Sequence, residues 1–135
     1  MLMTKAFTFA AFSLALASLS SAHAAGKHPI KVLPGYTCMA INQTDEEAMD
    51  FNHPALFKSA PSDTASDAGL AGAQMAIKTG ASPVNGYLPT LRIDFKPAWV
   101  KATLVKPYAA AADPKARCVP AVMSDGTQGF MYAHH

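Results

Sequence analysis

Several features typical of catalytic and nucleic-acid-binding proteins are missing from this 135-residue sequence. No G-x-S-x-G motif marks a nucleophilic serine, and no C-x-x-C or H-x-x-x-H spacing orders ligands for a metal. The 11 lysine and arginine residues are scattered along the chain, and the formal net charge is only +2. We therefore expect no nucleic-acid partner, because such binding needs a concentrated basic surface.

Long apolar runs are also missing after residue 24, and a membrane span takes about 20 apolar residues. Residues 1–24 instead have the three parts of a secretory signal peptide. These are a basic start at Lys5, an apolar run over 6–19, and the A-x-A site Ala22-His23-Ala24. We predict cleavage after Ala24, with Ala22 as the competing position and an uncleaved membrane anchor as the alternative. A periplasmic or secreted protein of one small domain, without membrane insertion, is the expectation.

Cysteine is scarce, since Cys38 and Cys118 are the only two in the chain. An even number of cysteines in an exported protein predicts a disulfide bond. A bond between these two residues requires the two ends of the domain to lie side by side. A reactive thiol or a metal site is the alternative, but no histidine is spaced to join either cysteine.

Short alternations of apolar and polar residues, separated by turn residues, predict an all-β fold. We expect a flexible lead-in over 25–35 and a β domain over 36–135, closed by a hairpin at Asp125-Gly126. Thr44 and Glu47 have the spacing of a capping box and predict one short helix over 45–50. Asp113 predicts a capped turn at Pro114. The expected strands lie at 36–41, 56–59, 73–78, 87–94 and 98–105.

Residues 56–108 carry a pattern of small motifs that is similar to a known family. The motifs are Ala60-Pro61-Ser62, Gly69, Asn85-Gly86-Tyr87 and Trp99-Val100. In this order they resemble a bacterial SH3 domain. The resemblance implies a small SH3-like barrel, here with extra terminal strands or a hairpin, and a turn of helix after the tryptophan strand. It also implies a binding module, because members of the family commonly contact cell-wall peptide or protein partners.

Trp99 is the only tryptophan, and two interpretations of it remain open. Alternation over 99–104 places the even-numbered residues toward a core and the odd-numbered residues on the opposite face. The indole then either packs over that face or forms part of an aromatic groove that stacks on a peptide or sugar. The candidate ligand-binding residues are Tyr87, Trp99, Lys101 and Tyr108.

Three functional hypotheses follow, and none of them uses a cofactor. The first is an exported, non-catalytic module that binds cell-wall peptide or an envelope protein. The second is a stand-alone inhibitor of an envelope hydrolase, which would insert the acidic segment Asp45–Asp50 or the Asp125-Gly126 hairpin into the enzyme. The third is a minor enzyme that uses Asp50 and His53 as acid and base. No metal site is expected, and the histidines after the predicted signal peptide are expected to be solvated; they are His28, His53, His134 and His135.

Overall fold

The computed structural model describes residues 26–134, so the predicted signal peptide lies outside the described residues. It confirms an all-β fold with one short helix and one 3-10 turn. No helix among the described residues is long and apolar enough to cross a membrane. The elements in chain order are β1 (Pro29–Val32), β2 (Tyr36–Ile41), α1 (Asp45–Met49), β3 (Leu56–Lys58), β4 (Asp67–Leu70), β5 (Gln74–Lys78), β6 (Tyr87–Leu91), β7 (Pro97–Lys101), the 3-10 turn η1 (Ala102–Leu104), β8 (Val105–Pro107), β9 (Ala116–Met123) and β10 (Gln128–His134).

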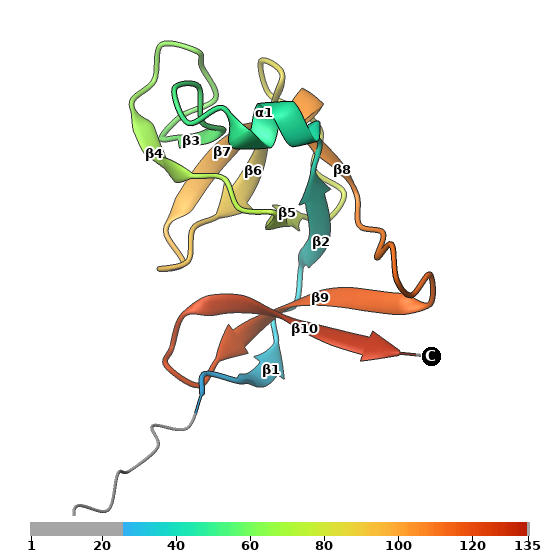
Figure 1. The fold of residues 1–135 in the computed structure, drawn as a ribbon. Helices are drawn as coiled ribbons and strands as arrows, with labels where there is room; N and C mark the ends of the chain where they lie inside the picture. The colour runs from blue at the N-terminus through green and yellow to red at the C-terminus, as the bar shows by residue number, and fades with distance from the viewer. Residues whose placement is uncertain (1–25, 135) are drawn as a thin grey trace, which may run out of the picture.

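The strands form two antiparallel sheets. The larger sheet has the order β4-β3-β7-β6-β5-β2-β8, and the smaller has the order β1-β9-β10. In Figure 1 the larger sheet and α1 lie above the smaller sheet, and β2 runs upward from the smaller sheet toward α1. The larger sheet does not close into the barrel that was expected, because β4 and β8 remain as its two edges.

The hydrophobic core is built from alternate residues of neighbouring strands. Met75 and Ile77 of β5 pack with Ala98 and Val100 of β7 and with Phe57 of β3. The predicted alternation therefore holds from Pro97 to Lys101. It ends there because the chain turns into η1, so the expected single strand over 98–105 is divided into β7 and β8.

The disulfide between Cys38 and Cys118 is present, as predicted, with a Cα–Cα distance of 5.7 Å. It joins β2 of the larger sheet to β9 of the smaller one. Cys38 is the direct partner of Ala76 on β5, and directly opposed residues share one face of a sheet. The smaller sheet therefore covers this outer face, which explains why Ala76 is fully buried.

The predicted hairpin at Asp125-Gly126 is confirmed. It connects β9 to β10, Gly126 has a φ of 81°, and the amide of Thr127 donates to Oδ1 of Asp125 at 3.0 Å. Asp113 also caps the expected turn, since its Oδ1 accepts from the amide of Lys115 at 2.9 Å. Both predictions succeed because a few adjacent residues determine each turn.

Two segments that were expected to be irregular form strands instead. Within the lead-in over 25–35, the segment Pro29–Val32 is β1, and within the loop after β3, the segment Asp67–Leu70 is β4. Both are edge strands, paired on one side only with β9 and β3. Each is only four residues long and mostly exposed, so neither carries an apolar alternation long enough to mark a strand in the sequence.

Candidate functional site

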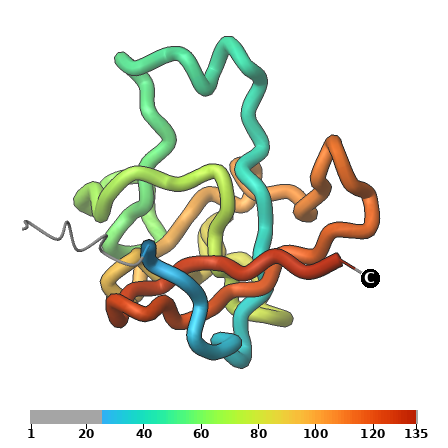
Figure 2. Tube along the Cα trace, turned by 60° about the horizontal axis from the view of Figure 1, so that its bottom comes forward, coloured from blue at the N-terminus to red at the C-terminus, as the bar shows by residue number. Residues whose placement is uncertain are grey.

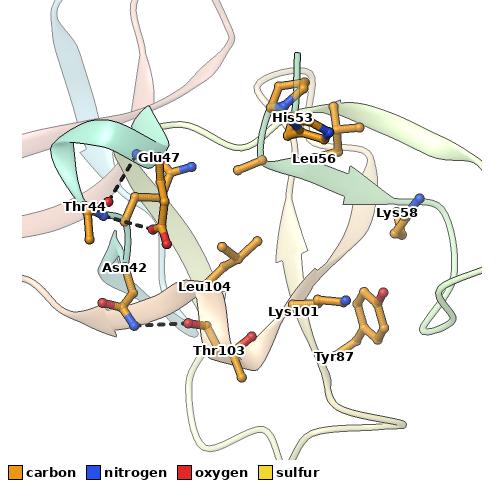
Figure 3. A pocket seen from close by; sticks show the side chains of 13 residues that line it. Asn42, Thr44, Glu47, His53, Leu56, Lys58, Tyr87, Lys101, Thr103 and Leu104 are labelled. Atoms are coloured by element: carbon orange, nitrogen blue, oxygen red, sulfur yellow. Dashed lines mark hydrogen bonds between the residues drawn. The ribbon is translucent and has the colours of Figure 1, made fainter. Parts of the chain in front are cut away.

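A cavity of about 750 Å³ opens between the α1 segment, β3 and the 3-10 turn η1. Figure 3 shows its side chains converging from these elements and from the facing ends of β6 and β7. Its volume is in the range of cavities that hold small ligands. The lining residues are Asn42, Gln43, Thr44, Glu47, His53, Pro54, Ala55, Leu56, Lys58, Tyr87, Lys101, Thr103 and Leu104.

One wall of the cavity is set by the capping box at the start of α1. The amide of Glu47 donates to Oγ1 of Thr44 at 3.1 Å, and the amide of Thr44 donates to Oε2 of Glu47 at 3.0 Å. The side chain of Asn42 donates to the carbonyl of Thr103 in η1 at 3.1 Å. These bonds fix the helix start, as the sequence predicted, and tie it to the turn across the cavity.

The opposite wall is set by a cluster around Tyr87. Tyr87 and Lys101 are direct partners on β6 and β7, so their side chains leave the same face of the sheet. The Tyr87 hydroxyl donates to Oδ1 of Asp63, and the Lys101 ammonium lies 3.4 Å from the same oxygen. Lys58 of β3 pairs with Asp67 at 2.7 Å. Two lysines and a tyrosine hydroxyl thus stand together on this side.

The same cluster shifts the titration of its members. The hydrogen bond to Asp63, helped by burial, raises the pKa of Tyr87 to about 12. The hydrogen bond from Tyr87 and the ammonium of Lys101 lower the pKa of the Asp63 carboxyl. Tyr87 therefore stays a neutral donor, and Asp63 stays an anion, across the physiological range.

We expect Tyr87 to ionise late in an alkaline titration of the folded protein. Its folded pKa is above the unfolded value of about 10, so its bond to Asp63 stabilises the fold fully below that pH. The stabilisation is lost as the pH rises through about 12. Tyrosinate absorbance of wild type and of Tyr87→Phe measures this, because the variant should lack one late-ionising tyrosine.

Asp63→Asn provides the control for this titration. Burial also raises the pKa of Tyr132, so two tyrosines ionise late. Comparing the titration curves of the variants identifies which late ionisation belongs to Tyr87. Removing the Asp63 charge should move the Tyr87 midpoint toward lower pH. An unchanged midpoint in Asp63→Asn would contradict the assigned cause.

The four predicted ligand-binding residues occupy three different places. Tyr87 and Lys101 both line the cavity. Trp99 is half-buried on the same face of β7 but two pairs further along, where its partners are Pro89 and Lys58. It does not line the cavity. Tyr108 instead packs against Tyr132 of β10, with ring centroids 6.2 Å apart. The aromatic groove of three rings is not assembled.

The proposed acid–base pair does come together. Nδ1 of His53 lies 3.0 Å from Oδ2 of Asp50, and the hydrogen bond lowers the pKa of Asp50. The His53 side chain is 83% exposed, so water solvates the pair. No buried surroundings adjust the two groups for proton transfer.

Among residues 26–134 no three potential metal ligands cluster. His28 immediately precedes β1 and contacts the carbonyl of Gly26. His134 is the last residue of β10 and contacts Asp113. His53 lies elsewhere in the chain, in the loop between α1 and β3.

Sequence reasoning missed several residues of the cavity. Leu56, Lys58 and Leu104 were assigned only to strands, and Asp63, which lies outside the cavity but contacts Tyr87 and Lys101, was assigned only to a loop. Glu47 was recognised as a capping residue, but its second role as a cavity wall depends on the approach of η1. The signal that existed was the choice of Tyr87 and Lys101 as candidate ligand-binding residues, both within the segment that resembles an SH3 domain.

No family model, no curated protein and no solved structure matches this chain. The cavity and the side chains around it are therefore the basis for assigning a function.

Proposed function

We propose that this protein is an exported, non-catalytic binding module of SH3-like architecture that holds a peptide in the cavity beside α1. The peptide belongs to the cell wall or to an envelope protein. The observation that carries the proposal is the cavity itself, which combines apolar side chains of Leu56 and Leu104 with converging polar groups. This combination is usual for sites that bind a ligand in one orientation.

The strand arrangement supports the SH3-like part of the proposal. η1 lies between β7 and β8, where the resemblance implies a turn of helix. β8 then pairs with β2, and the segment from α1 to β4 forms a long excursion between β2 and β5. The cavity lies between this excursion and η1, so one loop and one turn could be adapted to a ligand without changing the core.

The disulfide supports the exported location. Disulfide bonds persist in oxidising compartments and are rare where thiols are kept reduced. Together with the signal peptide expected over residues 1–24, the Cys38–Cys118 bond favours the periplasm or the exterior of the cell.

The proposal predicts that Lys101→Ala weakens binding to purified peptidoglycan about tenfold, the usual effect of losing one charged hydrogen bond. Co-sedimentation of the oxidised protein measures the affinity. Lys106→Ala is the matched control, because it removes the same charge from β8 at a position outside the cavity.

Trp99→Ala separates the two candidate surfaces in the same experiment. Binding that survives this substitution leaves Trp99 as a packing residue and the cavity as the site. Saturable binding that is lost in Trp99→Ala but kept in Lys101→Ala would contradict the cavity as the site. If no form of the protein sediments with peptidoglycan, envelope proteins become the ligand to test.

A specific observation also favours the inhibitor hypothesis. The segment that contains α1 arches away from the rest of the chain in Figure 2. None of the α1 residues is buried, and beyond its end Phe51 is 80% exposed. An acidic protruding segment with an exposed aromatic ring is the kind of element that could insert into the cleft of a partner enzyme. Under this hypothesis Phe51→Ala abolishes inhibition of an envelope hydrolase, whereas Lys101→Ala has no effect.

A further inference from the structure

We propose that the cavity recognises a short peptide by its opposite ends, taking an ammonium group beside Glu47 and a carboxylate beside Lys58 and Lys101. This inference rests on the proposed function and specifies its ligand. Free amino and carboxyl groups are the chemistry of short peptides, including those of the cell wall, and are absent from the interior of a protein strand.

The acidic end is the α1 wall. Oε2 of Glu47 accepts one hydrogen bond from the Thr44 amide. No lysine or arginine among the described residues forms an ion pair with Glu47. A carboxylate has about four acceptor sites, so most of this capacity is open to a cationic ligand group.

The basic end is the wall across the cavity, as Figure 3 shows. Lys58 and Lys101 each contact one aspartate, but an ammonium group has three donors. The lysines line the cavity, whereas their partners Asp63 and Asp67 do not. Each lysine therefore retains donors for a ligand group, and the side chains of Lys58 and Lys101 are 23% and 52% exposed.

Part of the remaining lining is small and apolar. Pro54, Ala55, Leu56 and Leu104 contribute it, and Leu104 lies between the Glu47 side and the Lys101 side in Figure 3. Such a surface suits methyl side chains and the flat faces of peptide bonds. The ligand that fits is therefore charged at its ends and small and apolar in its middle.

The test uses soluble peptides released from purified peptidoglycan, in four chemical forms. The forms are unmodified, acetylated on the amines, amidated on the carboxyl groups, and blocked at both. Titration calorimetry with the full oxidised protein should show that each single block weakens binding about tenfold or more.

Matched variants assign each effect to one end of the cavity. In Glu47→Gln acetylation should cause no further loss, and in Lys101→Gln amidation should cause none. Glutamine retains the capping box, so Glu47→Gln changes the charge without removing the helix cap. Glu46→Gln and Lys106→Gln remove the same charges outside the cavity and should respond to both blocks as wild type does.

Three results would overturn the proposal, and they differ in which of its parts they leave intact. If all four forms bind with equal affinity, the end-to-end recognition is wrong while the binding module remains. If no form binds to protein that melts cooperatively, the cell-wall ligand fails together with the inference. A block that weakens every variant equally would show that Glu47 and Lys101 are not the groups that recognise the ends.

Discussion

Replacing Cys38 and Cys118 together by serine should lower the free energy of unfolding by about 4.5 kcal/mol. The bond closes a loop of 80 residues, and chain entropy assigns about this value to a loop of that length. The whole stability of a small domain is often about 5–10 kcal/mol. The variant is therefore expected to be partly unfolded at 37 °C, as urea unfolding followed by circular dichroism would show.

Reductant gives the control for this prediction. Adding it to the wild-type protein should reproduce the loss, whereas the double serine variant should not respond to it. A double variant as stable as the oxidised protein would mean that the two sheets hold together without the covalent link.

Met75→Ala should lower the free energy of unfolding by about 3 kcal/mol, within the range for truncating a large buried side chain. Met75 is 2% exposed and packs at the centre of the core with Ile77 and Val100. The loss has two parts, because apolar surface is no longer buried and a cavity remains that the surrounding strands cannot fill.

Met49→Ala is the matched control for Met75→Ala. Met49 is 67% exposed at the end of α1, so its truncation should change the unfolding free energy by no more than about 0.5 kcal/mol. Equal losses in the two variants would contradict the position of the core between β5 and β7.

The features that the sequence predicts correctly depend on residues close together in the chain, or on a pairing that has only one possible solution. The Thr44–Glu47 capping box and the Asp125-Gly126 hairpin each involve residues within a few positions of one another. The disulfide has only one possible pairing, because the chain has two cysteines. Strands β2 and β5 are found because larger and smaller side chains alternate along them, even though both faces of β5 are covered from Met75 to Ile77.

The features that the sequence does not reveal depend on contacts between distant residues. β1 is a strand only because β9 offers it an edge, and Asp63 meets Tyr87 across 24 positions of sequence. The same limit applies to the site. Tyr108 and Trp99 stand out in the sequence because aromatic residues are rare in it. Their positions in the fold depend on strand register and on the identity of the neighbouring strand, and the sequence composition reveals neither.

The position of β1 and β10 has a consequence for how the protein can be attached. Both strands flank β9 in the smaller sheet, whereas the cavity lies beside α1 at the far end of the larger sheet (Figure 1). A linker joined before β1 or after β10 leaves from the end of the molecule that is remote from the cavity. Immobilised by either end, on a sensor surface or on a carrier protein, the domain would present the cavity outward.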